Sequence, residues 1–199
     1  MRAGRRRFNV GRLATATDPA GTLRDAVAEL LATAIFVFAA EGSGWCRWPS
    51  RSRPPWHAPS TSPGHVNPAI TFVALLGGRV CLVRSLLYWV AQLLGAVAGA
   101  LLLRLATGGV RLPEYALAGG MTGWHAVVLD AAMAFGLMYA YYATAMDPRG
   151  RHAGAVAPLA VGLLAGANVL ACGALDGAVM NPARAFGPAI VGSRRWSNH

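Results

Sequence analysis

Long apolar blocks alternate along the chain with short polar segments. The blocks cover residues 23–40, 85–103, 125–145 and 153–173. A helix of about 20 apolar residues matches the roughly 30 Å hydrocarbon core of a bilayer, and the first block reaches this length when its Gly-Ser-Gly end is counted. The pattern therefore predicts four membrane-spanning helices, the first of which contains the acidic residue Glu29.

Two further apolar blocks, residues 67–78 and 181–191, are too short to cross a membrane. Each begins with the same triplet, at Asn67-Pro68-Ala69 and at Asn181-Pro182-Ala183. Asn is a favourable N-cap, and Pro fits the first position of a helix, where no N–H is needed. The second block extends about 15 Å at 1.5 Å per residue, which is half of the hydrocarbon core. We predict two half-helices, one in each half of an internally duplicated chain.

Two helix N-termini that meet at mid-membrane would direct their positive dipole ends at one point. This arrangement disfavours cations, whereas the Asn amides can still donate hydrogen bonds to a passing neutral molecule. The non-helical backbone before each half-helix must be buried in protein or line a water-filled cavity at that depth. A single Asn-Pro is also compatible with a capped surface helix, but two copies flanked by spanning helices favour a pore.

Charged residues inside predicted membrane segments are candidates for function. Arg184 follows Asn181 by three positions, on the first turn of the second half-helix, where it would face the cavity as a selectivity element. Glu29 and Asp130 lie early in two spanning blocks, and we expect them to accept hydrogen bonds from backbone amides of the two re-entrant loops. A proton relay is the alternative, but the neighbouring sequence supplies no second titrating group.

Histidine and cysteine do not indicate a metal site. His65 belongs to the first re-entrant loop, where it would either line the pore mouth or form a structural hydrogen bond. The other histidines are too scattered for metal-ligand spacing, and the three cysteines are isolated. We expect neither a metal ion nor a cofactor.

Composition supports a membrane setting and excludes some other classes of protein. Hydrophobic residues make up 55% of the chain and charged residues 13%, against about 25% charged residues in soluble domains. The net charge of +10 comes from basic residues that lie between apolar blocks, so we expect lipid and no nucleic acid as a partner. Ser43 lacks a nucleophile motif and a nearby histidine base, so we expect no enzyme activity.

The polar segments show where the chain departs from a regular bundle. Residues 45–63 combine prolines with arginines. Prolines break a helix, and each arginine would cost about 2.5–3.5 kcal/mol at mid-membrane, so this segment cannot form a membrane-spanning helix. The basic N-terminal segment 1–22, the pair Arg79 and Arg84, and a later arginine pair all favour the cytoplasmic side. Only one predicted helix separates the first two groups. One crossing is therefore missing, unless weak loops override the charge rule.

The motifs resemble those of aquaporins in the major intrinsic protein superfamily, and most closely the plant tonoplast intrinsic proteins. The resemblance implies an all-α membrane protein, an inverted repeat of six spanning helices with two re-entrant half-helices. It also implies a homo- or hetero-tetramer in the vacuolar membrane that conducts water. The stretches that carry it are residues 22–44, Gly64-His65-Val66-Asn67-Pro68-Ala69, residues 166–171, Met180-Asn181-Pro182-Ala183-Arg184 and Phe186-Gly187-Pro188-Ala189.

The resemblance further implies a selectivity constriction, of which Val169, Ala178 and Arg184 can be placed. The fourth position would come from the second family helix. Val and Ala are less bulky and less polar than the aromatic and histidine lining of strict water channels, so urea or glycerol could pass besides water. Tyr115 aligns with a position at which some relatives carry a pore-lining histidine.

Two of the six family helices are not apparent in this sequence. Residues 45–63 stand in place of the second, and the tail 192–199 stands where the sixth would follow, so we expect an incomplete channel domain over residues 23–191. An open pore wall would expose loop backbone to lipid at a cost of several kcal/mol per group. The alternative to a water channel is therefore a truncated, non-conducting subunit that interacts with full-length channels. Liposomes that contain the chain and swell at family-like rates would refute this alternative.

Overall fold

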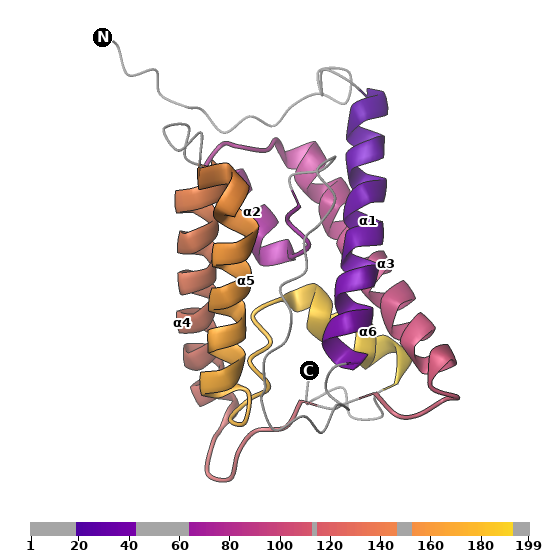
Figure 1. Ribbon diagram of the computed structural model, residues 1–199, viewed down its shortest axis with the longest axis vertical. Helices are drawn as coiled ribbons and strands as arrows, with labels where there is room; N and C mark the ends of the chain where they lie inside the picture. Colours follow the sequence, from indigo (N-terminus) through magenta and orange to yellow (C-terminus); the bar gives the residue numbers. More distant parts are fainter. Residues whose placement is uncertain (1–18, 43–63, 113–114, 147–152, 193–199) are drawn as a thin grey trace.

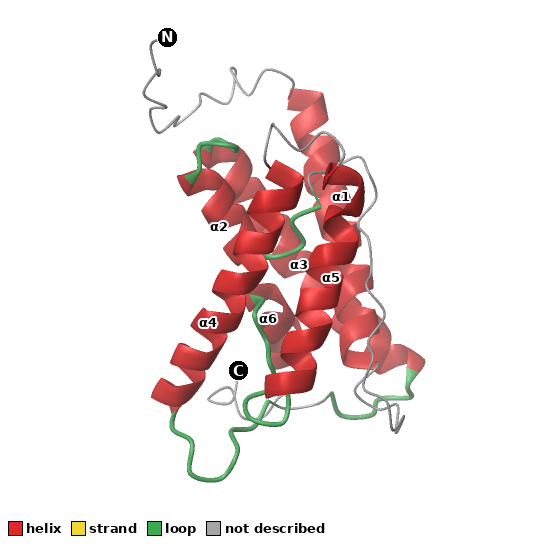
Figure 2. Cartoon of the chain, turned by 60° about the vertical axis from the view of Figure 1, so that its left-hand side comes forward, coloured by secondary structure: helices red, strands yellow, loops and turns green. Residues whose placement is uncertain are grey.

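The computed structural model describes residues 19–42, 64–112, 115–146 and 153–192, which form helices joined by loops and turns and contain no strand (Figure 2). Within these residues, four helices are long and two are short. The long ones are α1 (Pro19–Gly42), α3 (Leu82–Ala106), α4 (Gly123–Tyr141) and α5 (Ala153–Cys172), and the short ones are α2 (Pro68–Leu76) and α6 (Pro182–Val191). A π-helical turn, Tyr142–Met146, continues α4. The prediction of an all-α fold with two short helices is confirmed.

Three of the predicted segments fall largely outside this part of the chain. Residues 1–18 of the basic N-terminal segment, all of the Pro/Arg-rich segment 45–63 and residues 193–199 of the tail lie outside the described residues.

In the described part of the chain, two helices meet the length and hydropathy expected of a membrane span, Leu82–Ala106 and Gly123–Ala145. In α5, residues Ala157–Cys172 form a shorter apolar stretch. The first predicted span, α1, is long enough, but each stretch of 18 residues in it contains more than two charged side chains; its acidic residues are Asp25, Glu29 and Glu41. These three carboxylates are only 9%, 0% and 2% exposed, so they are buried against protein rather than turned toward lipid.

The long helices form two pairs around the short ones. Helix α1 packs along α3, and α4 packs along α5 (Figure 1). The half-helix α2 contacts α3 and α4, and α6 packs against α3 (Figure 1). The two half-helices therefore lie inside the bundle, and the long helices hold them in place.

The pairing of α1 with α3 depends on two glycines that lie one helical turn apart. A Cβ atom on Gly95 would lie 2.3 Å from the carbonyl oxygen of Leu30, and one on Gly99 would lie 2.2 Å from that of Ala34. Glycines one helical turn apart allow two helix backbones to approach closely, and these two lie at such a contact. Gly166 in α5 differs, because no described heavy atom outside its own helix lies within 4 Å of its Cβ position.

This contrast gives a stability prediction. We expect Gly99→Ala to lower the free energy of unfolding by about 1–3 kcal/mol, because the added methyl group must push α1 away from α3. The matched control, Gly166→Ala, adds a methyl group in open space and gains up to about 1 kcal/mol of helix propensity. Thermal unfolding in detergent, followed by circular dichroism, compares the two variants. Equal melting temperatures would contradict the close contact at Gly99.

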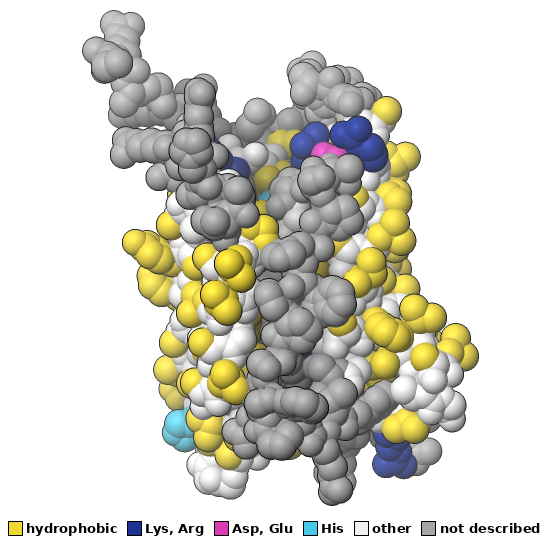
Figure 3. All heavy atoms as spheres, viewed as in Figure 1, with side chains coloured by type: hydrophobic (Ala, Val, Ile, Leu, Met, Phe, Trp, Pro, Cys, Tyr) yellow, Lys and Arg dark blue, Asp and Glu magenta, His cyan; other side chains and the backbone are white. Residues whose placement is uncertain are grey.

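The outer surface is largely apolar. Hydrophobic side chains cover the flanks of the helices, and charged side chains gather toward the upper and lower ends of the visible face (Figure 3). Along α4, Trp124 is 71% exposed and Phe135 is 72% exposed. Large exposed apolar surfaces of this kind fit contact with lipid or with another subunit rather than with water.

Candidate functional site

The two half-helices begin with the same cap. Asn67 and Asn181 have extended backbone conformations, and each is followed by a proline at the start of the helix. The Asn67 side chain accepts a hydrogen bond from the N–H of Ala69 at 2.9 Å, and Asn181 accepts one from Ala183 at 3.0 Å. The triplets thus form N-caps, in agreement with the physical interpretation of the sequence.

Each cap residue also bonds to the loop that precedes the other half-helix. Nδ2 of Asn67 donates to the carbonyl oxygen of Met180 at 3.0 Å, and Nδ2 of Asn181 donates to the carbonyl oxygen of Val66 at 3.0 Å. These reciprocal bonds join the N-terminal ends of α2 and α6. An amide carries two N–H groups, so each asparagine keeps one for another acceptor.

The backbone that supplies these two carbonyl groups is strained. Val66 has φ 52° and Met180 has φ 51°, and Ala178 has φ 45° in the second loop. They are the only non-glycine residues with positive φ in the described part of the chain. This conformation is unfavourable for residues with a Cβ, above all for a β-branched one, and costs on the order of 1–3 kcal/mol each. The reciprocal asparagine bonds help to hold Val66 and Met180 in place.

Glu29 anchors the first loop from α1. Its carboxylate accepts hydrogen bonds from the backbone N–H groups of His65 and Val66, both at 2.8 Å. These are the re-entrant loop amides that the sequence analysis expected as donors. A third bond, from Nε2 of Gln92 at 2.9 Å, comes from α3 and was not foreseen. A side chain that is 0% exposed thus has three donors.

His65 packs between aromatic rings at the same level. Its ring makes edge-on contacts with Tyr88 and Tyr141 at centroid distances of 5.6 Å and 5.8 Å. Nδ1 lies 3.0 Å from Oγ1 of Thr71, so the hydrogen bond within this loop and its half-helix, one of the two roles left open, is present.

A polar path links His65 with Glu29. Nε2 of Gln92 donates to Thr71 as well as to Glu29, at 3.0 Å and 2.9 Å. The fold therefore supplies the second titrating group that the neighbouring sequence lacks. The amide of Gln92 lies between the two groups and does not titrate, so the path is not a continuous chain of acids and bases.

Asp130 is the corresponding acid of the second half, with weaker contacts. Its Oδ1 accepts from the N–H of Met180 at 3.2 Å, the type of donor that was expected. A second acid, Asp176, lies in the loop itself and accepts from the N–H of Ala178 at 2.8 Å. Asp176 was not predicted as a site residue, although an Asp side chain commonly accepts from the backbone N–H two residues further on in a turn.

Arg184 is buried in the wall rather than extended into open space. It is 4% exposed, its Nε donates to Glu41 at 3.0 Å, and its Nη1 donates to the carbonyl oxygen of Ala178 at 2.8 Å. The guanidinium lies 5.5 Å from the centre of the Tyr115 ring. The Tyr115 hydroxyl donates to the same Glu41 oxygen at 2.8 Å.

The structure brings the three predicted constriction residues into one neighbourhood. Val169 packs against the apolar cluster that contains Ala178 and Met180, and Ala178 bonds to Arg184. Glu41 also belongs to this neighbourhood and was not predicted as a site residue from the sequence. Its signal was an acid at the end of an apolar block, directly before Gly-Ser-Gly.

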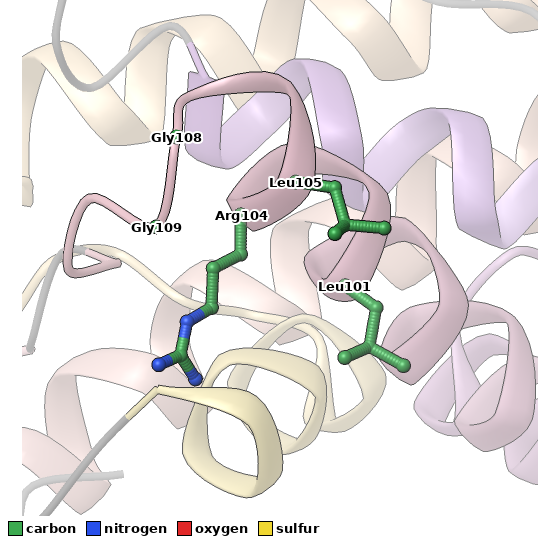
Figure 4. A pocket seen from close by; sticks show the side chains of 5 residues that line it. All are labelled: Leu101, Arg104, Leu105, Gly108 and Gly109. Atoms are coloured by element: carbon green, nitrogen blue, oxygen red, sulfur yellow. The ribbon is translucent and has the colours of Figure 1, made fainter.

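A shallow depression of about 350 Å³ lies elsewhere, at the end of α3 (Figure 4). It is lined by Leu101, Arg104, Leu105, Gly108 and Gly109. Arg104 extends from α3 toward α6 and donates to the carbonyl oxygen of Val191. Its polar group therefore ties two helix ends together. Within the described residues, no group of three His, Cys, Asp or Glu side chains could hold a metal ion.

Comparisons with known proteins give consistent matches. The model of the family described as Major intrinsic protein matches residues 57–199. The chain is 57% identical to Aquaporin TIP3-1 of Zea mays, over 98% of this chain and 81% of that protein. It is 45% identical to Aquaporin TIP1-2 of Musa acuminata, over 89% and 79%, and 43% identical to Probable aquaporin TIP3-2 of Arabidopsis thaliana, over 99% and 83%.

Proposed function

The chain belongs to the major intrinsic protein family, and from this premise we propose that it is a membrane channel for the passive transport of water. The observation that carries the proposal is the reciprocal bonding of Asn67 and Asn181, which joins two helix N-termini inside the bundle. The protein is an integral membrane protein of the vacuolar membrane, like the tonoplast intrinsic proteins to which it is similar.

The joined N-termini explain how water could pass without cations. Each asparagine retains one N–H group, so a water molecule between them would accept two hydrogen bonds through its oxygen atom. Its hydrogens would then point away from the asparagines, toward the waters on either side. The positive ends of the α2 and α6 dipoles oppose any cation at the same place.

We also propose that Val169, Ala178 and Arg184 form the narrowest part of the path. Two of these side chains are small and apolar, and the third is held in the wall by its bonds to Glu41 and Ala178. This composition supports passage of small neutral solutes such as urea or glycerol besides water. The mechanism requires neither a cofactor nor an enzyme activity.

Stopped-flow light scattering on liposomes that contain the purified chain tests the proposal. We expect them to shrink several times faster than protein-free liposomes after an osmotic step. Val169→Trp, which adds a ring at the proposed constriction, is expected to return the rate to that of lipid alone while the protein still folds. Shrinkage of wild-type liposomes at the lipid rate would overturn the proposed channel activity.

A second candidate is a non-conducting subunit that associates with full-length relatives. The apolar side of α4 favours it, since Trp124, Val127, Phe135 and Tyr139 are 71%, 56%, 72% and 68% exposed. The same face would serve a homo- or hetero-tetramer of conducting subunits. Co-reconstitution with a full-length relative separates the candidates: a non-conducting partner co-purifies with the relative but adds no flow of its own.

A further inference from the structure

Glu41 is a buried acid that the proposed path for water does not use. It lies in the last turn of α1 and is 2% exposed. Its Oε1 accepts from Nε of Arg184 at 3.0 Å and from the hydroxyl of Tyr115 at 2.8 Å. These two partners come from distant parts of the chain, the second half-helix and the loop before α4.

We propose that Glu41 determines solute specificity by positioning Arg184: it holds the guanidinium in the wall and compensates its charge, so that uncharged solutes larger than water pass. This inference rests on the proposed channel function. It assigns to α1 a residue of the constriction, in addition to the three placed on α5, the second loop and α6.

The contacts of Arg184 show how it is held. Nε bonds to Glu41, Nη1 bonds to the carbonyl oxygen of Ala178, and the guanidinium lies over the ring of Tyr115 at 5.5 Å. A guanidinium that is 4% exposed needs an anion beside it, because an unpaired buried charge is strongly unfavourable. Without the carboxylate, the long side chain would turn its charged end toward the nearest water, which is the path itself.

Tyr115 helps to hold both Glu41 and Arg184 in place. Its hydroxyl donates to the carboxylate oxygen that Arg184 uses, and its ring packs against the guanidinium. Glu41 therefore cannot rotate away without losing two bonds at once. Because the pair is close to neutral, exclusion of cations falls mainly to the N-termini of α2 and α6, and the constriction selects by width and polarity.

Paired measurements of water and urea flow in the same liposomes test this role. Glu41→Gln keeps the size of the side chain and an oxygen acceptor but removes the charge. We expect the urea-to-water permeability ratio to fall by about tenfold, because the released guanidinium narrows the path for urea more than for water. Asp25→Asn is the matched control, because it also replaces a carboxylate by an amide on α1. Oδ2 of Asp25 lies 3.7 Å from Nη1 of Arg84. The ratio of this control should equal that of the wild type.

The same substitution made in Arg184→Gln protein distinguishes a role in positioning Arg184 from a general effect on the structure. In Arg184→Gln protein, Glu41→Gln should cause no further change in the ratio, because its effect passes through the guanidinium. An equal change in both backgrounds would overturn the proposal, as would a wild-type ratio in Glu41→Gln protein that conducts water.

Tyr115→Phe covers the case in which Glu41→Gln does not fold. This variant removes only the hydroxyl group and keeps the ring, and it should lower the ratio in the same direction by a smaller factor. An unchanged ratio would overturn the proposal. Wild-type liposomes that pass no more water than lipid would instead reject the channel function itself, and the role of Glu41 with it.

Discussion

Replacing Glu29 with alanine is expected to lower the free energy of unfolding by about 3 kcal/mol or more. The substitution leaves three donors without their acceptor: the N–H groups of His65 and Val66 and the amide of Gln92. Each buried donor that loses its partner costs about 1–3 kcal/mol. The strained φ of Val66 would lose one of the contacts that hold it. Denaturant or thermal unfolding in detergent measures the loss.

Asp130→Ala is the matched comparison in the second half of the molecule. Asp130 accepts from the N–H of Met180 at a longer distance, 3.2 Å, and is not fully buried, so we expect a loss of about 1–2 kcal/mol. The loss in the free energy of unfolding for Glu29→Gln should fall between those of Glu29→Ala and Asp130→Ala, because glutamine keeps one carbonyl oxygen as an acceptor for the loop. Equal losses for Glu29→Ala and Asp130→Ala would show that the three bonds of Glu29 stabilise the protein no more than the weaker contacts of Asp130 do.

Local features of the sequence predict the helices well. The predicted block 85–103 lies within α3 (Leu82–Ala106), and the short block 181–191 matches α6 (Pro182–Val191). Long apolar runs and Asn-Pro caps act through neighbouring residues, so the sequence alone contains their signal. The amide donors of Glu29 were also predictable, since a buried acid near a re-entrant loop has few other partners.

Partners that are distant along the chain could not be predicted in the same way. The bond from Asn67 to Met180, and the contacts of Glu41 with Tyr115 and Arg184, join segments that only the packing of helices brings together. Glycine spacing shows the same limit. It predicts that a glycine can sit at a close crossing, but whether a second helix lies there depends on the fold, as Gly166 illustrates.

The second large effect concerns cations, and Asn181→Asp is the variant that should show it. The new carboxylate keeps the acceptor for the N–H of Ala183, and an anion at a helix N-terminus is favourable, so α6 should still form. The bond from Nδ2 to the carbonyl oxygen of Val66 is lost. The centre of the proposed path thereby changes from two neutral donors to one donor and one anion.

The attraction between a cation and a single negative charge at this place is large enough to lower the barrier to cations substantially. Two unit charges 4 Å apart interact by about 4 kcal/mol at an effective dielectric constant of 20, and about 1.4 kcal/mol corresponds to a factor of ten. We therefore expect at least about a tenfold rise in K⁺ flux through Asn181→Asp, measured with a potential-sensitive dye in liposomes.

Asn181→Ser separates the charge from the loss of the bond to Val66. Serine also caps a helix and also lacks the amide donor, but it is neutral, so liposomes with this variant should remain tight to K⁺. If Asn181→Ser admits K⁺ as readily as Asn181→Asp, the barrier depends on the mechanical joining of the two loops. If neither admits K⁺ while both conduct water, the N-termini of α2 and α6 do not form the cation barrier.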